Sequence, residues 1–275
     1  MVILKTEVLL DGLLFPESPR WYNNKLWFSD QEMNKVMTVN LEGEVEIIIE
    51  MENRPSGLGW LPDGKLLIVS MEDRRLLSLD PSGLNEYADL SRLSTFYCND
   101  MVVDKKGRAY VGNFGFDYFN RESFVPAEIV LVTSKGNARV VANDMAFPNG
   151  TVITPDEKLL IVAETFATRL TAFNILDDGS LTDRRIWASL RAIPPDGICL
   201  DAEGAIWVSA PGRHRVVRVL EGGEITHKVK VETDAYACML GGPERDILFI
   251  TTSTDERNNG RIEFVKVDVP GVGLP

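Results

Sequence analysis

The chain has 275 residues, of which 44% are hydrophobic and 25% charged, as is usual for a globular protein with a sizeable core. Its net charge of −12 argues against a nucleic-acid partner, because phosphates require a basic surface. No run reaches the ~18 apolar residues that a membrane-spanning helix needs, and the first residues lack the pattern of a signal peptide. We therefore expect a cytoplasmic protein that acts on a small molecule, without a membrane as partner.

A short motif recurs six times, in which a small or polar residue precedes a run of apolar residues. Successive motifs start 39, 43, 50, 47 and 41 residues apart. A repeat of this length, built of short β-runs and Gly/Asp turns, is typical of the blade of a β-propeller. Each motif is predicted to form the innermost strand of a blade. The motifs span residues 17–21, 56–60, 99–103, 149–153, 196–200 and 237–241.

Further strands are predicted after each motif, separated from it by turns rich in Gly, Asp, Asn and Pro. The second strands are expected at residues 25–29, 65–69, 108–112, 158–162, 205–209 and 246–250. The third strands are expected at residues 35–39, 75–79, 128–132, 169–173, 215–219 and 261–265. Outer strands follow, for example at residues 45–49 and 225–229, and no segment has a helical period over a dozen residues.

The fold class predicted from this pattern is all-β, with residues 1–275 forming one domain of six four-stranded blades. The last blade shows only three strands before the Pro/Gly-rich tail at residues 270–275. The β-rich run at residues 2–10 has no inner strand of its own. We expect this N-terminal run to close the ring as the outer strand of the last blade, which would also cover an exposed edge.

The first residues of the six motifs should converge where the inner strands begin, at the mouth of a central channel. Two carboxylates and two amides meeting there would make the all-oxygen site that a hard cation such as Ca²⁺ requires. The residues at this position are Glu17, Ser56, Asn99, Asn149, Asp196 and Ala237. Zn²⁺ is less favoured because no His or Cys occupies a ligand position. A purely structural Ca²⁺ ion on the axis is an alternative.

Each of these residues also has an ordinary structural interpretation. Glu17 could be a solvated loop residue, and the Pro-Asn-Gly and Pro-Asp-Gly sequences around Asn149 and Asp196 are common turns. Their shared position before an inner strand favours the ligand interpretation for Glu17, Asn149, Asp196 and Asn99. By strand alternation, Asp100 is expected to point the other way and to bond backbone or orient its neighbour.

Four motifs together resemble those of the regucalcin (senescence marker protein), gluconolactonase and luciferin-regenerating-enzyme family, in order and over essentially the whole chain. The motifs are Phe-Pro-Glu-Ser-Pro-Arg-Trp (15–21), Asn-Asp-Met-Val-Val-Asp (99–104), Phe-Pro-Asn-Gly (147–150) and Pro-Asp-Gly-Ile-Cys-Leu-Asp-Ala-Glu-Gly (195–204). The resemblance implies a six-bladed propeller with one catalytic divalent metal on its axis. It places the metal ligands on Glu17, Asn149 and Asp196, with Asn99 as ligand or substrate contact. Many members hydrolyse lactones, and a related branch cleaves organophosphates.

The chain departs from the family where sugar-lactone members often carry an arginine that contacts the polyol. Tyr97 stands at that position, and we expect it to line the pocket beside Asn99. Aromatic residues in loops on the same side, Phe114, Phe116, Phe147 and Tyr236, are expected to contact substrate, although blade packing would also explain them. They favour an aliphatic or aromatic lactone, or another ester, over a heavily hydroxylated sugar acid.

The longest insertion, residues 114–125, is predicted to be a lid, since long loops on rigid scaffolds tend to carry binding functions. Asp117 within it is a candidate substrate contact. Glu164 follows a second strand and is expected either to face the pocket or to be a surface carboxylate.

The function predicted is hydrolysis of lactones or related esters that depends on a divalent metal, Ca²⁺ first, with Mg²⁺, Mn²⁺ and Zn²⁺ as alternatives. The metal would polarise the carbonyl, and Asp196 would accept a proton from the attacking water or, less favoured, attack directly. The sequence lacks a Gly-x-Ser-x-Gly motif, which disfavours a serine hydrolase. A non-catalytic Ca²⁺- or ligand-binding propeller and an organophosphate hydrolase are the alternatives. We expect a monomer or a homodimer.

Overall fold

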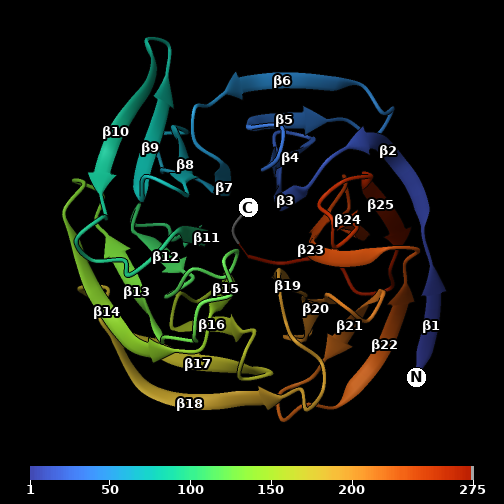
Figure 1. Cartoon of the computed structure of the whole chain (residues 1–275). Coiled ribbons are helices and arrows are strands. Elements are labelled where there is room, and N and C mark those ends of the chain that lie inside the picture. Colours follow the sequence, from blue (N-terminus) through green and yellow to red (C-terminus); the bar gives the residue numbers. More distant parts are fainter. Residues whose placement is uncertain (274–275) are drawn as a thin grey trace.

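Every regular element in residues 1–273, the part of the chain that the computed structural model describes, is a β-strand. The strands form six sheets arranged in a ring around a common centre (Figure 1). This confirms the prediction of a six-bladed β-propeller. Within the same residues, no helix has the length and apolarity needed to cross a membrane.

Consecutive strands build each of the first four blades from the centre outwards. The first blade contains β3 (Pro16–Tyr22), β4 (Lys25–Asp30), β5 (Lys35–Val39) and β6 (Val45–Glu50). The second contains β7 (Pro55–Trp60), β8 (Leu66–Ser70), β9 (Arg75–Asp80) and β10 (Gly83–Asp89). The third contains β11 (Cys98–Val103), β12 (Ala109–Asn113), β13 (Ala127–Val132) and β14 (Ala138–Met145). The fourth contains β15 (Pro148–Ile153), β16 (Leu159–Glu164), β17 (Arg169–Ile175) and β18 (Leu181–Ser189).

The last two blades each receive a strand from the N-terminus. The fifth contains β19 (Ile198–Leu200), β20 (Ile206–Ala210), β21 (Arg215–Val219), β22 (Ile225–Lys230) and β1 (Val2–Lys5). The sixth contains β23 (Asp234–Gly241), β24 (Ile247–Ser253), β25 (Gly260–Lys266) and β2 (Glu7–Leu13).

Ring closure follows the prediction in β2, which pairs antiparallel with β25 as the outer strand of the last blade. The residues before it do not continue that strand. They form β1, which runs parallel to β22 and gives the fifth blade an additional strand. Thr6 separates the two strands, and its hydroxyl donates a hydrogen bond to the Glu263 carboxylate. By bending at Thr6, the N-terminal segment pairs with the outer edges of two neighbouring blades, and each edge would otherwise be unpaired.

The core lies between adjacent blades, which pack face to face. Inner strands such as β7 and β11 are therefore buried along their whole length, whereas an outer strand such as β6 is largely exposed. Trp207 and Phe249 are among the largest fully buried side chains. Because an inner strand is covered on both faces, most of its side chains are apolar. The polar residue at the start of the strand differs from this pattern.

Candidate functional site

A cavity of about 150 Å³ opens at the end of the ring where the inner strands begin. Glu17, Asn99, Asn149 and Asp196 all line it, and we call these four residues the floor. The structure thus brings together the four residues that the sequence singles out as metal ligands. Each is buried, with between 6% and 9% of its surface exposed.

Beta-bulges at the start of the inner strands place the floor residues. The ladder shifts register between Glu17 and Arg20 in β3, and between the residues flanking Asn99 in β11 and Asn149 in β15. A bulge leaves residues unpaired and re-aims their side chains. In the fifth blade Asp196 lies two residues before β19, so it too stands outside the regular ladder. The polar residues therefore leave the sheet at the point where the strands meet.

The glycine that follows Asn149 or Asp196 is required by close packing between blades. A Cβ on Gly150 would lie 2.5 Å from the backbone nitrogen of Ile198, and a Cβ on Gly197 would lie 2.4 Å from the Cβ of Ala237. Neither glycine has a positive φ angle. The Pro-(Asn/Asp)-Gly sequences are consequently positions where one inner strand abuts the next.

Glu17 is folded back on its own backbone. Ser18 adopts a positive φ of 50°, and its N–H donates to Glu17 Oε2 at 2.9 Å. This bond alone does not offset desolvation: burial, with Asp100 nearby, raises the pKa of Glu17 to about 7. The nearby charges of Arg257 and Arg20 offset only part of this cost, so this carboxylate is costly to keep charged without a bound cation.

Asp196 has fewer hydrogen bonds than Glu17 to offset the cost of burying its charge. No hydrogen bond from residues 1–273 reaches its buried Oδ1 atom. Burial, followed by the charges of Glu17 and Asp100, raises the pKa of Asp196 well above its ordinary value. Two buried carboxylates whose pKa values are both raised, one of them with an unpartnered oxygen, are the arrangement that a bound cation would relieve.

The two amides of the floor use their nitrogens, and not their oxygens, in hydrogen bonds within the described chain. Asn149 Nδ2 donates to Thr165 Oγ1 at 3.4 Å, and Asn99 Nδ2 makes a long 3.5 Å contact with the carbonyl of Pro148. Thr165 Oγ1 in turn donates to the carbonyl of Pro195 at 2.8 Å, so its lone pairs accept from Asn149. With both amide nitrogens engaged by neighbouring backbone or hydroxyl groups, both Oδ1 atoms remain as acceptors.

The floor fits a hard divalent cation. Its donors are carboxylate and amide oxygens, which Ca²⁺ accepts, whereas Zn²⁺ prefers nitrogen and sulfur. Among residues 1–273, no three His, Cys, Asp or Glu side chains converge as a metal site, which is consistent with a floor that has only two carboxylates. The third nearby carboxylate, Asp100, is neutralised by Arg20 and also accepts the N–H of Met101, as expected of a residue that bonds backbone.

One wall of the cavity is aromatic and comes from the third and fourth blades. Phe114 and Phe147 stack with ring centroids 4.6 Å apart, and Phe147 lies 5.2 Å from Phe166. Tyr118, in the insertion after β12, completes this wall. Phe114 and Phe147, two of the predicted substrate contacts, line the cavity. Phe166 lies at its rim and is 48% exposed.

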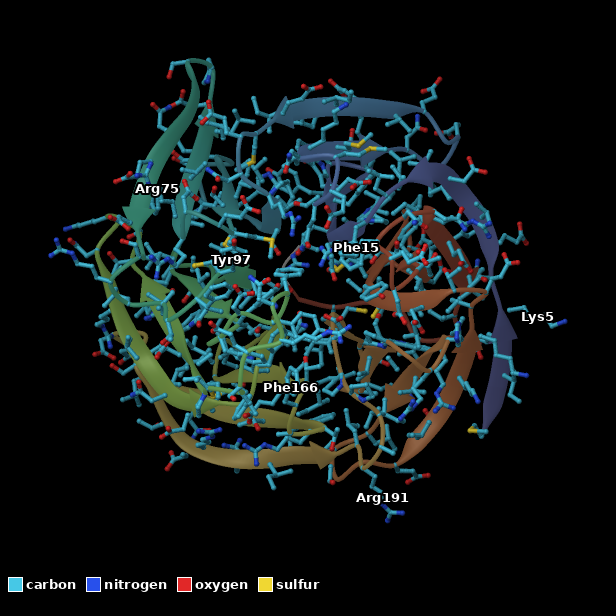
Figure 2. The ribbon with its side chains drawn as sticks, viewed as in Figure 1. Lys5, Phe15, Arg75, Tyr97, Phe166 and Arg191 are labelled. Atoms are coloured by element: carbon cyan, nitrogen blue, oxygen red, sulfur yellow. The ribbon has the colours of Figure 1, made fainter. Side chains whose placement is uncertain are left out.

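The facing wall comes from the first and sixth blades and is mixed in character. Phe15 and Tyr236 lie with ring centroids 4.5 Å apart, and Tyr236 occupies the bulge of β23. Gln31 and Arg257 supply the polar groups of this wall. Figure 2 shows Phe15 and Phe166 on either side of the centre of the ring.

Three predicted substrate contacts do not line this cavity. Tyr97 stacks on Phe96 at 4.3 Å and lies behind Phe114, at 6.5 Å. Phe116 is buried edge-on against Phe147, at 6.1 Å. Asp117 holds the turn of the insertion by accepting from both nitrogens of Asn120. Tyr97 and Phe116 therefore support the aromatic wall from behind, and Asp117 shapes the loop.

Glu164 is neither a pocket residue nor a surface carboxylate. It is fully buried and bound by Arg169, Thr171 and the N–H of Ala146. Although burial alone would raise its pKa, bonds from Arg169 and Thr171 hold the pKa of Glu164 below its ordinary value. It ties the turn before β15 to the fourth blade.

Sequence reasoning missed Arg257, Gln31, Phe15 and Tyr118 as cavity residues. Each lies in a turn or loop just outside a strand, where the blade repeat carries no register information. Phe15 immediately precedes the motif that contains Glu17, and Tyr118 lies in the insertion proposed as a lid. The positions of Phe15 and Tyr118 in the sequence could therefore have indicated them, whereas nothing near Arg257 or Gln31 in the sequence indicates a cavity residue.

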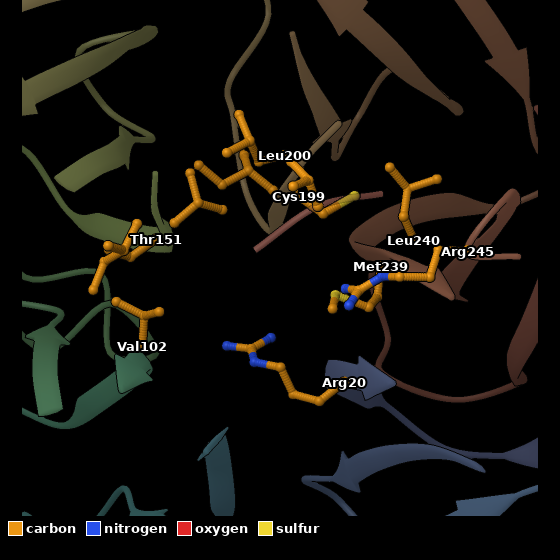
Figure 3. A pocket seen from close by; sticks show the side chains of 12 residues that line it. Arg20, Val102, Thr151, Cys199, Leu200, Met239, Leu240 and Arg245 are labelled. Atoms are coloured by element: carbon orange, nitrogen blue, oxygen red, sulfur yellow. The ribbon is translucent and has the colours of Figure 1, made fainter. Parts of the chain in front are cut away.

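A second, smaller cavity of about 30 Å³ lies further along the same inner strands (Figure 3). Arg20 and Arg245 enter it, together with apolar residues such as Val102 and Leu240. The C-terminal segment also contacts this cavity, and the N–H of Val272 donates to the carbonyl of Leu200 at 3.2 Å. This volume holds about one water molecule, so the larger cavity is the candidate site.

Comparison with known proteins identifies the family. The model described as the SMP-30/gluconolactonase/LRE-like region matches residues 15–254. The chain belongs to this family. An uncharacterized protein of Sulfolobus acidocaldarius is 24% identical over 267 residues, 93% of each chain. The lactonase drp35 of Staphylococcus aureus is 27% identical over 230 residues, which cover 78% of this chain and 67% of the lactonase.

Solved structures agree with the fold. A luciferin-regenerating enzyme has a TM-score of 0.85 at 17% identity, covering 98% of this chain and 97% of its own. Regucalcin of Agrobacterium tumefaciens, described as a calcium-binding protein, has a TM-score of 0.85 at 22% identity, covering 100% and 98%. A gluconolactonase of Xanthomonas campestris has a TM-score of 0.77 at 22% identity, covering 94% and 89%. These likenesses confirm the six-bladed propeller, and the match to the family model confirms the resemblance indicated by the motifs.

Proposed function

We propose that this protein hydrolyses lactones with a divalent cation, Ca²⁺ first, held by Glu17, Asn149, Asp196 and Asn99. The observation that carries the proposal is the all-oxygen floor, in which burial raises the pKa of two carboxylates and one of them keeps an unpartnered oxygen. Relatives named lactonase and gluconolactonase support lactone hydrolysis at the level of the family.

A bound divalent ion would supply Lewis-acid polarisation of the scissile carbonyl. Glu17 and Asn149 contribute oxygens that hold such an ion, and Asn99 contributes one to the ion or an amide contact to the substrate. Asp196 accepts the proton of the attacking water, because it is a carboxylate on the cavity floor. The aromatic wall excludes bulk water from one side of the reacting group.

The aromatic wall also bears on the class of lactone. Hydroxyl groups of a sugar lactone that faced Phe114, Phe147 and Phe166 would lose their hydrogen bonds to water without replacement, which costs about 1–3 kcal/mol for each group. An aliphatic or aromatic lactone ring meets no such penalty. We therefore expect higher kcat/KM for apolar γ- and δ-lactones than for gluconolactone.

The direct test is a metal-dependent screen of the purified protein against γ- and δ-lactones, sugar lactones and an aryl phosphotriester. Hydrolysis that is abolished by a chelator, restored by Ca²⁺ and accompanied by an unchanged circular dichroism spectrum supports the proposal. Full activity in excess chelator contradicts it. Phosphotriester turnover without lactone turnover would instead favour an organophosphate hydrolase.

A non-catalytic Ca²⁺-binding propeller is the second candidate, and the fold shared with a calcium-binding regucalcin is the observation in its favour. It predicts tight Ca²⁺ binding at the floor without turnover of any substrate in the screen. Calorimetric titration with Ca²⁺, run beside the screen, separates the two candidates.

A further inference from the structure

Arg257 is the one basic side chain that lines the cavity within residues 1–273. It lies in the turn between β24 and β25, in the sixth blade, and leans over the first blade. Its guanidinium carbon is 3.7 Å from the centroid of Phe15, and its side chain is only 22% exposed. A guanidinium stacked on an aromatic ring has its flat face occupied and its N–H edges free to bind in its own plane.

Residues of the first blade hold one edge of this guanidinium. Arg257 Nη2 donates to Gln31 Oε1 at 2.5 Å, and Gln31 Nε2 donates to Ser56 Oγ at 3.3 Å. Arg257 Nε lies 2.5 Å from Glu32 Oε1, but its N–H is not directed at that oxygen, so the contact is a charge pair rather than a hydrogen bond. No residue in the described chain accepts a hydrogen bond from Nη1.

The charges around Arg257 alternate in sign up to the cavity. Glu72 pairs with Arg54 at 3.4 Å, Arg54 pairs with Glu32 at 3.3 Å, and Glu32 pairs with Arg257. Arg257 is the last member of this row, and its side chain lines the cavity. The next anions beyond Arg257 are the floor carboxylates Glu17 and Asp196, whose charges Arg257 partly offsets. A bound divalent cation would take over that compensation and leave the Nη1 side of Arg257 for an anion of the substrate.

We propose that Arg257 binds a carboxylate carried by the substrate, so that the preferred substrates are compact lactones with an acidic substituent. This inference rests on the proposed lactone hydrolysis and adds the substrate class. A carboxylate is the anion that an arginine edge binds in two-point fashion. The carboxylate would lie against the mixed wall of Phe15 and Gln31, and the ring would lie against the aromatic wall.

The size of the cavity limits the ring. A volume of about 150 Å³ is that of a cavity known to admit benzene. A five- or six-membered lactone fits this volume, and any longer substituent would have to extend through the mouth of the cavity. The substrate class is therefore a monocyclic lactone bearing one carboxylate.

The test compares 5-oxotetrahydrofuran-2-carboxylate, a γ-lactone with a carboxylate, with its neutral carboxamide at saturating Ca²⁺. We expect the wild type to favour the carboxylate by about 10- to 100-fold in kcat/KM, the range of a charge-assisted hydrogen bond. Arg257→Gln should reduce that ratio about 10-fold or more, and Arg257→Lys should keep part of it. Arg54→Gln is the matched control, because Arg54 pairs with the same Glu32 but does not line the cavity, and it should retain the wild-type ratio.

A binding measurement without turnover separates this inference from the proposed function. Cyclopentanecarboxylate should bind the wild type about 10-fold or more tightly than cyclopentanecarboxamide by calorimetry, and Arg257→Gln should abolish the difference. Two results would overturn the role of Arg257 and leave the proposed function intact. One is turnover of neutral lactones with no preference for the carboxylate, and the other is equal binding of the two ring compounds. Absence of any lactone turnover, with the carboxylate still preferred in binding, overturns the proposed reaction and leaves the anion site in place.

Discussion

Arg20 of the first blade and Asp100 of the third blade form a buried ion pair beneath the floor of the site, with Arg20 Nη2 2.7 Å from Asp100 Oδ1. Arg20 also donates to the carbonyl of Met101, so one side chain reaches past the whole second blade. The pair removes Asp100 from the set of free carboxylates and fixes the bulge that carries Asn99. The same ion pair therefore contributes to the stability of the fold and to the position of Asn99 in the site.

Replacing Arg20 by leucine should destabilise the protein strongly. It would leave Asp100 buried without its partner, which typically costs about 3–5 kcal/mol. The double variant Arg20→Leu/Asp100→Leu should recover a large part of this loss, because no uncompensated charge remains. Urea unfolding of the three proteins measures the effect, and a single variant within about 1 kcal/mol of the wild type would show that the pair is not needed.

The stability of the metal-free protein should fall as the pH rises. The pKa of Glu17 is about 7 in the folded chain against an ordinary value of 4.5, so between these values the folded state holds more protons than the unfolded state. Linkage then makes the protein about 2 kcal/mol more stable at pH 5.5 than at pH 8 through this group. Unfolding in the presence of a chelator at the two pH values checks the sign.

Two further measurements test the part of that pH dependence that belongs to Glu17. Glu17→Gln should remove this part, because the amide does not titrate, and should leave the part that belongs to Asp196, whose pKa burial also raises. Addition of Ca²⁺ should stabilise the wild type more at pH 8 than at pH 5.5, since the ion binds the charged carboxylate. A metal-free protein whose stability rises from pH 5.5 to pH 8 would contradict the assignment.

The blade repeat made the fold and the floor predictable, because each inner strand is buried on both faces and its polar first residue stands out. Alternation alone could not describe the bulges. It predicts opposite directions for Asn99 and Asp100, whereas the shift in β11 leaves both outside the ladder. It also cannot reveal that β1 joins the fifth blade, since the bend at Thr6 depends on edges far away in sequence.

The walls of the cavity were less predictable than the floor, because their residues lie in turns. Tyr97 is two residues from Asn99, yet its ring is directed behind Phe114. Arg257 is remote from every motif, and its position depends on Phe15 and Gln31 of another blade. Such contacts are set by how turns from different blades meet, which a repeat of this kind does not encode.

Substitution of Gly197 by alanine should damage both stability and metal binding. The new Cβ would be 2.4 Å from the Cβ of Ala237, so the inner strands of the fifth and sixth blades must separate. Overpacking of this kind costs about 1–3 kcal/mol, and the shift would move the adjacent Asp196.

Gly212→Ala is the matched control for that substitution. Gly212 has a positive φ of 69°, but nothing lies within 4 Å of an added Cβ. The control should lose about 1 kcal/mol of stability and keep its affinity for Ca²⁺. Calorimetry on both variants decides the question, and equal Ca²⁺ affinity in Gly197→Ala and the wild type would show that the glycine serves packing only.

Asp196→Asn should abolish turnover more thoroughly than it weakens metal binding. The amide keeps an oxygen that can bind a cation, as we propose for Asn149, but it cannot accept a proton from water. Loss of a general base typically reduces the rate by about 10²- to 10⁴-fold. Because one anionic donor is also lost, kcat must be measured at saturating Ca²⁺, with the affinity for Ca²⁺ determined separately by calorimetry. Near-wild-type kcat in the metal-loaded variant would restrict Asp196 to holding the ion. The base would then have to be sought elsewhere on the floor, and Glu164 could not serve, because it is fully buried and bound by Arg169 and Thr171.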